Sequence, residues 1–129
     1  MNRRRAFSEV SFESKFGYCR AIRVGNHIYV SGTASIDPEG ATYAPGNAYV
    51  QTRYCLEKIQ KALQDLDANI QDVVRSRMYV TDISRSAEYG KAHQEFFGEH
   101  PPASTMVEVR SLVEAGMLVE IEVEAICNS

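Results

Sequence analysis

The feature that most constrains the fold is a pair of short, largely apolar runs on either side of a Gly-Asn dipeptide. Residues 18–24 and 27–33 are rich in β-branched and aromatic side chains, which indicates two strands. Between them, Gly25 and Asn26 are residue types that accept the positive φ of a tight two-residue turn. The sequence therefore predicts a β-hairpin, and the length of its turn fixes which residues pair.

The predicted register brings polar side chains together. A two-residue loop pairs Val24 with His27, so Tyr18 faces Thr33 and Arg20 faces Ser31. These residues alternate along each strand and therefore lie on one side of the ribbon. We expect this side of the hairpin to carry a polar cluster.

The remaining elements predict an α+β fold. Apolar residues spaced by three and four predict helices, and β-branched or alternating stretches predict strands. The expected helices cover residues 47–67 and the segment from an N-cap at Ser86 to just before Pro101. The expected strands cover 73–81, 104–110 and 117–126. A short turn at Gly116 is expected to join the last two strands. The order is ββαβαββ, which predicts one mixed sheet with two helices packed on one face.

Composition limits the class of protein. A chain of 129 residues, 44% hydrophobic and 24% charged, fits a single domain at 1–129, with residues 1–15 as a partly flexible tail. The net charge of −3 argues against nucleic acid as a partner, and no apolar run is long enough for a membrane. Three cysteines without CxxC spacing indicate reduced thiols and a cytoplasmic protein.

Three glutamates alternate with apolar residues in the last predicted strand and are the best generic candidates for chemistry: Glu120, Glu122 and Glu124. On a wet face they are solvated charges, which is the interpretation we favour for Glu122 and Glu124. In a cleft, desolvation raises the pKa of Glu120 and suits its carboxyl to proton transfer. The three histidines are scattered along the chain, so no metal site is predicted.

Several fragments, in order, resemble the RidA/YjgF family of reactive-intermediate deaminases. They span residues 16–127 and comprise Tyr18-Cys19-Arg20-Ala21, Val24-Gly25-Asn26, Tyr29-Val30-Ser31-Gly32, Tyr79-Val80-Thr81-Asp82, Phe96-Phe97, Pro102-Ala103 and Val119-Glu120-Ile121-Glu122. The resemblance implies a chorismate-mutase-like fold and a homotrimer with ligand clefts between subunits. It also implies hydrolysis of small enamines or imines to a keto acid and ammonia, without a metal or organic cofactor.

The resemblance also assigns residues to the cleft. Tyr18 matches the family's cleft tyrosine, Ser31 and Gly32 match the turn whose backbone lines the pocket, and Glu120 matches the acid that holds the attacking water. Thr33 stands where the family usually has Gln. We include Met106 among the substrate-binding candidates.

The chain departs from the family at the carboxylate-binding position. Family deaminases carry Pro-Ala-Arg, whose guanidinium grips the substrate carboxylate, whereas this chain has Ser104 in that place. The family's helix asparagine and tyrosine are replaced by Gly90 and His93. Arg20 either binds an anionic group in the cleft or is an ordinary surface residue of its strand.

The sequence is therefore consistent with two functions from different classes, an enzyme and a binding protein. The first is a deaminase-like hydrolase of imines or enamines other than simple 2-imino acids. The second is a noncatalytic trimer that binds a small metabolite or a partner protein in the same clefts. An endoribonuclease activity, attached to this family by name, is a third possibility that the negative net charge does not support.

Overall fold

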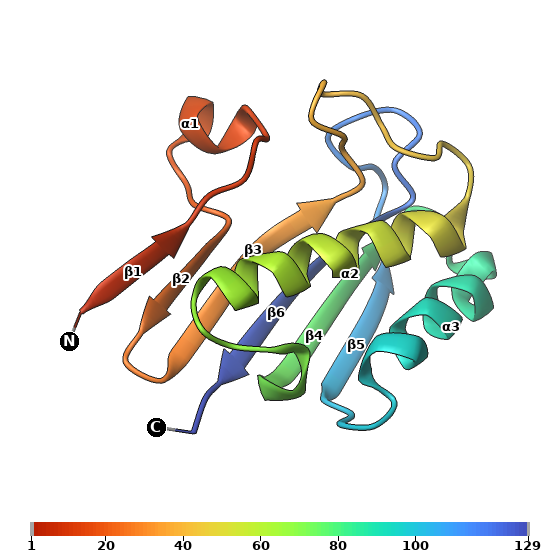
Figure 1. Ribbon diagram of the computed structural model, residues 1–129. Helices are drawn as coiled ribbons and strands as arrows, with labels where there is room; N and C mark the ends of the chain where they lie inside the picture. Colours follow the sequence, from red (N-terminus) through yellow and green to blue (C-terminus); the bar gives the residue numbers. More distant parts are fainter. Residues whose placement is uncertain (1, 129) are drawn as a thin grey trace.

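The computed structural model describes residues 2–128 and contains one six-stranded mixed sheet (Figure 1). Neighbouring strands are antiparallel except β4 and β5, which are parallel. In spatial order the strands are β1 (Arg3–Ala6), β2 (Ala21–Val24), β3 (His27–Ala34), β6 (Val119–Ile126), β4 (Val73–Val80) and β5 (Ala103–Glu108). The predicted α+β class and mixed sheet are confirmed.

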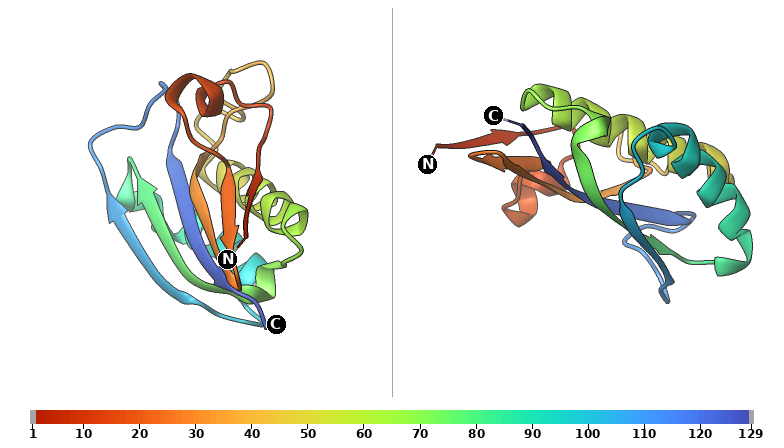
Figure 2. Two further views of the ribbon diagram at one scale, coloured as in Figure 1. Left: turned by 90° about the vertical axis from the view of Figure 1, so that its left-hand side faces the viewer. Right: turned by 90° about the horizontal axis from the view of Figure 1, so that it is seen from below.

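Both long helices cover the same face of the sheet (Figure 2). Helix α2 (Ala48–Asp65) begins where the Asn47 side chain accepts a hydrogen bond from the Val50 N–H. Helix α3 (Ser86–Phe97) begins at Ser86, the expected N-cap, so its cap is Arg85, the last residue of the short turn η2 (Ile83–Arg85). No helix among residues 2–128 has the length and apolar character needed to cross a membrane.

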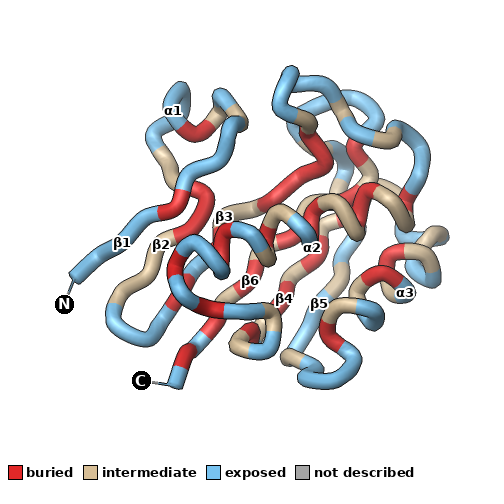
Figure 3. The backbone as a smooth tube through the Cα atoms, viewed as in Figure 1, coloured by how far each residue is buried: buried red, intermediate tan, exposed pale blue. Residues whose placement is uncertain are grey.

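The core lies between these helices and the sheet (Figure 3). Helix α2 buries a stripe spaced by three and four residues, and alternate residues of β6 meet it; the fully or almost fully buried members include Cys55, Leu56, Ile59, Leu63, Val119, Ile121 and Val123. Each such apolar side chain contributes roughly 1.5–3 kcal/mol of transfer free energy. Because one face of β6 is used in this way, its glutamates lie on the opposite face.

The hairpin has the predicted register. Ala21 pairs with Val30, and Val24 pairs with His27 across the turn. Gly25 takes a φ of 62°, the positive value that the tight turn requires. Sequence patterning therefore identified the turn and the register beside it. The ladder ends at Ala21 and Val30, so the expected pairing of Tyr18 with Thr33 is not part of it, because the chain bulges between Val30 and Thr33.

The N-terminal segment differs from the expected partly flexible tail. Residues 3–6 form the edge strand β1, in which Arg3 pairs with Val24 and Ala6 pairs with Ala21. Helix α1 (Phe12–Phe16) follows. The exposed arginines of β1 gave no alternating apolar pattern, and only Ala6 enters the core. Met1 and Ser129 lie outside the described residues.

The last two strands are not neighbours, contrary to the short turn expected between them. Strand β4 separates β5 from β6, and residues 109–118 form a long connection across the end of the sheet. Buried Gln51 fixes this connection, because its Nε2 donates to the carbonyls of Ala44 and Gly116 while its Oε1 accepts from the Leu118 N–H. The pattern of strand and turn residues could not reveal that β5 joins β4 in parallel through α3.

Candidate functional site

A bulge in β3 forms the first part of the site. The β3–β6 register shifts between Val30 and Thr33, so Ser31 and Gly32 leave the regular ladder. The Ser31 N–H donates to the Arg20 carbonyl over 2.9 Å, and the Ser31 hydroxyl donates to the Cys19 carbonyl over 2.8 Å. The bulge is thus held by the neighbouring chain segment, and the Gly32 backbone is brought next to β6.

Glu120 packs directly against this bulge. A Cβ atom at Gly32 would overlap the Glu120 carboxylate, so only glycine allows the carboxyl to lie on the backbone there. Burial raises the pKa of Glu120; the nearby Arg20 charge opposes this shift, and Glu122 adds to it. The carboxyl is therefore a stronger proton acceptor than a solvated glutamate.

Arg20 supports the bulge from the interior. Its guanidinium Nη2 donates to the Gly32 carbonyl over 2.6 Å, and its Nη1 lies 3.4 Å from a Glu13 carboxylate oxygen. Both side chains are almost fully buried, and the guanidinium also lies 5.6 Å from the Tyr18 ring centre. Arg20 thus binds an anionic group, but that group is Glu13 of the same chain.

The other two glutamates of β6 are engaged on the same face of the sheet. Glu124 accepts a hydrogen bond from Arg77 over 2.9 Å, and Glu122 accepts one from the Tyr79 hydroxyl over 2.5 Å. The hydrogen bond to Glu124 raises the pKa of Arg77, and the one to Glu122 raises the pKa of Tyr79. These two carboxylates are therefore partnered rather than simply solvated.

A second polar cluster lies at the β5 edge, under α3. The Ser76 Oγ is 2.7 Å from the Ser104 Oγ and 2.8 Å from the His93 Nε2. Ser76 is fully buried, whereas Ser104 is exposed. Burial lowers the pKa of His93, so its imidazole is neutral near pH 7.

The two clusters lie on opposite faces of the sheet in one protomer. Glu120 pairs with Tyr79 on the face away from α2 and α3, because its neighbours in β6 face the core. Ser104 pairs with Ser76, which contacts His93 of α3, so these residues lie on the helix-covered face. Glu120 and Ser104 therefore do not meet within a single chain.

Comparison with known proteins identifies the family. Residues 8–127 match the family described as Endoribonuclease L-PSP. A RutC family protein of Pyrococcus abyssi is 38% identical over 105 residues, 81% of this chain and 82% of that protein.

The chain belongs to the RidA/YjgF superfamily. The crystal structure of Rv2704 from Mycobacterium tuberculosis, described as a member of the YjgF/YER057c/UK114 family, superposes with a TM-score of 0.89 at 42% identity, covering 98% of this chain and all of that one. The YjgF gene product of E. coli shares the fold, with a TM-score of 0.83 at 24% identity, covering 97% of this chain and 99% of that one.

Three other predicted site residues of this RidA/YjgF protein are buried or half-buried. Thr33 is fully buried and donates its hydroxyl proton to the Ser31 carbonyl over 2.8 Å. Met106 is half-buried and packs against the main core from β5. Tyr18 is half-buried beside Arg20.

Sequence reasoning missed Glu13 and Ser76. Ser76 could have been noticed, because it is a polar residue on the β4 face shared by Met78 and Val80. Val74, two residues before Ser76, is exposed because the register shifts between Val73 and Arg75. Glu13 left no signal in the sequence, because its contact with Arg20 depends on how α1 folds back.

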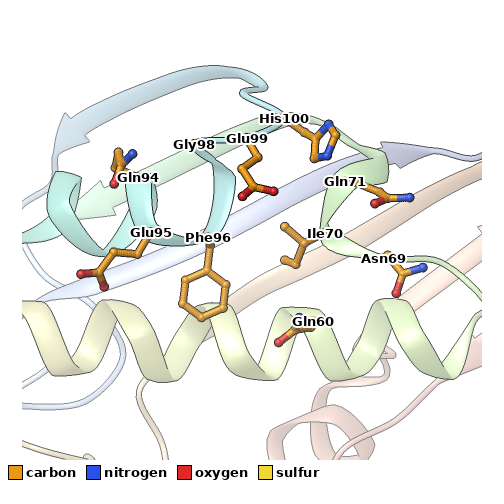
Figure 4. Close-up of a pocket in the computed structure, with 10 residues that line it drawn as sticks. All are labelled: Gln60, Asn69, Ile70, Gln71, Gln94, Glu95, Phe96, Gly98, Glu99 and His100. Atoms are coloured by element: carbon orange, nitrogen blue, oxygen red, sulfur yellow. The ribbon is translucent and has the colours of Figure 1, made fainter.

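A large groove lies elsewhere in this superfamily member. It has a volume of about 700 Å³ and lies between α2, the turn η1 (Ile70–Asp72) and the end of α3, where amide side chains such as Gln60, Gln71 and Gln94 surround it (Figure 4). None of the predicted site residues lines it. Among residues 2–128, no three His, Cys, Asp or Glu side chains gather closely enough to hold a metal ion.

Proposed function

We propose that the protein hydrolyses small imines or enamines in clefts formed between the subunits of a homotrimer. The position of Glu120 carries this proposal: a partly buried carboxyl with a raised pKa lies against the Gly32 backbone. The two polar clusters of one chain lie on opposite faces of the sheet, so a site that uses both needs two subunits. Membership of the RidA/YjgF superfamily supports this arrangement.

Glu120 supplies the acid–base chemistry in this mechanism. A water molecule bound to the carboxylate adds to the carbon of a protonated imine, and Glu120 takes one of its protons. The C=N π electrons move to nitrogen as the new C–O bond forms. The nitrogen then takes the proton from Glu120, and the C–N bond breaks. As ammonia leaves, the hydroxyl proton passes to the Glu120 carboxylate and the carbonyl forms.

The Ser104 position determines the substrate class. We propose that Ser104 replaces the arginine with which relatives grip a substrate carboxylate, because it follows Pro102-Ala103. A serine hydroxyl offers one hydrogen bond and no charge, so an uncharged group is accommodated better than a carboxylate. Arg20 does not compensate, since its guanidinium is bonded to Glu13 and Gly32.

The test compares two substrates that differ only in this group. 2-Aminoacrylate and its amide are generated in situ, and ammonia release is measured above the spontaneous rate. We expect acceleration for the amide, loss of it in Glu120→Gln, and gain of activity on 2-aminoacrylate in Ser104→Arg. Glu122→Gln is the matched control, because Glu122 is bonded to Tyr79 and not to Gly32.

Failure to accelerate either reaction, or full activity of Glu120→Gln, contradicts the hydrolase proposal. The second candidate, a noncatalytic binding trimer, is favoured by one observation, the uncharged Ser104 cluster in place of a cation. It predicts that keto acids or their amides bind in crystal soaks without any turnover. Binding that survives in Glu120→Gln but disappears in Ser104→Arg supports this alternative.

A further inference from the structure

A hydrogen-bonded chain of three side chains runs from the surface of β5 into the protein. The exposed Ser104 hydroxyl is 2.7 Å from the Ser76 Oγ, and the Ser76 Oγ is 2.8 Å from the His93 Nε2. Ser76 is fully buried, so solvent does not compete for its hydrogen bonds. These hydrogen bonds connect the surface hydroxyl of Ser104 to the titratable imidazole of His93 through the Ser76 hydroxyl.

The chemistry of these three side chains depends on which group donates and which accepts in each hydrogen bond. Each hydroxyl has one proton to donate, and a neutral imidazole accepts at one ring nitrogen. In the structure the Ser76 hydroxyl donates to the Ser104 oxygen. When His93 accepts at Nε2, the Ser76 hydroxyl rotates to donate to it, and the Ser76 oxygen is then free to accept from Ser104. Loss of the Ser104 proton thereby transfers one proton to Ser76 and another from Ser76 to His93.

His93 is held in the state that this transfer needs. Burial lowers its pKa, and its ring packs 4.5 Å from the Phe97 ring, which fixes its orientation. The titratable groups that α2 presents to α3, Tyr49 and Arg53, are both bonded to Glu95. From β4, the charged neighbours of Ser76, which are Arg75 and Arg77, lie on the other face of the sheet.

Helix α3 carries no side chain one turn before His93. Gly90 lies one helical turn before His93, and a Cβ atom placed on it would meet no atom within 4 Å. Strand β5 is also an edge of the six-stranded sheet, so backbone N–H groups on its outer side are available to a developing oxyanion.

We propose that Ser104 is a nucleophilic serine, activated through Ser76 by His93, that accepts acyl groups from small uncharged acyl compounds. The Ser104 Oγ forms a bond to the carbonyl carbon, its proton passes to Ser76, and the Ser76 proton passes to His93. The bond to the leaving group then breaks and the leaving group departs as an anion. This reactivity uses the Ser104 hydroxyl that the proposed imine hydrolysis assigns to substrate binding, but it does not use Glu120.

The experiment measures covalent modification of the full chain. Phenylmethylsulfonyl fluoride replaces the acyl donor: an Oγ–S bond forms, the S–F bond breaks and fluoride leaves. Intact-mass and peptide-mapping measurements follow the modification at pH 7.5. We expect Ser104 to react first, with the exposed Ser86 and Ser111 of the same chain as internal references.

The variants separate the relay from simple exposure. Ser76→Ala and His93→Gln leave Ser104 in place, and each is expected to slow its modification about 100-fold, the lower range for general base catalysis. Ser35→Ala is the matched control, because Ser35 is equally buried but donates to the Tyr43 carbonyl. In the unmodified sequence, the rate should fall as the pH is lowered through the pKa of His93, below 6.5. In His93→Gln this pH dependence should disappear.

Two results would overturn the proposal. One is modification of Ser104 no faster than that of Ser86 and Ser111. The other is a wild-type rate at Ser104 in His93→Gln, which decides the matter even if Ser76→Ala fails to fold. Neither result bears on imine hydrolysis, since Glu120 is not involved.

Discussion

The absence of a side chain at Gly32 leaves the space in which the carboxyl of Glu120, the candidate acid, lies. The carboxyl lies where a side chain on residue 32 would otherwise be, and this contact contributes to the burial that raises its pKa. The sequence predicted Glu120 through strand alternation and family resemblance together. Neither could reveal that Gly32 is needed for its placement, since that contact depends on the bulge in β3.

Replacing Gly32 by Ala should therefore displace the Glu120 carboxyl. We expect loss of imine hydrolysis, measured by ammonia release, and little change in the urea midpoint, because the overlapping atoms are the end of the flexible Glu120 side chain. Gly90→Ala is the matched control: its Cβ meets open space in the middle of α3, so it should stabilise the protein by about 0.5–1 kcal/mol. Full imine hydrolysis by Gly32→Ala would refute the packing argument.

At the scale of elements, α1 is tied to the sheet by the buried pair of Glu13 and Arg20. Glu13 also accepts hydrogen bonds from the N–H and the hydroxyl of Ser8, so one carboxylate joins the N-terminal segment, α1 and the bulge. The sequence predicted the hairpin, α2 and α3 because their periodicity is local. It did not predict β1 or α1, whose stability depends on pairing with β2 and on this ion pair.

Glu13→Ala should be strongly destabilising, because it leaves the Arg20 charge buried without a partner. Loss of one member of a buried pair costs about 3–5 kcal/mol, measurable as a lower urea midpoint. Arg4→Ala is the control: it breaks the exposed Arg4–Asp67 pair, whose atoms are 2.9 Å apart, and should cost less than about 1 kcal/mol. A similar loss in both variants would show that the buried pair has no special role.

At the scale of the whole molecule, the two long helices α2 and α3 lie on one face of the sheet, and within residues 2–128 the opposite face has no long helix over it (Figure 2). It carries Glu120 and the Arg77 ion pairs, together with exposed apolar residues such as Tyr29 and Val107. The proposed trimer would cover this face. Single-chain patterning predicted that one face is polar, but it could not tell solvent from a second subunit.

Light scattering tests this assembly directly. We expect a mass of three times 14.4 kDa, about 43 kDa, for the parent protein. Val107→Asp should give the single-chain mass, because a charge there opposes subunit contact without removing a buried side chain. Val113→Asp, at another exposed valine in the 109–118 connection, should leave the mass unchanged. A single-chain mass for the parent protein would remove the basis for clefts between subunits.

The place of β6 between β3 and β4 has a consequence for biosynthesis. Translation delivers this strand after the other five, yet it fills the middle of the sheet. Until it arrives, β3 and β4 each have an open edge, and the apolar stripe of α2 lacks half of its partners. The nascent polypeptide is therefore most vulnerable to aggregation just before β6 emerges from the ribosome, when chaperones have the most to protect.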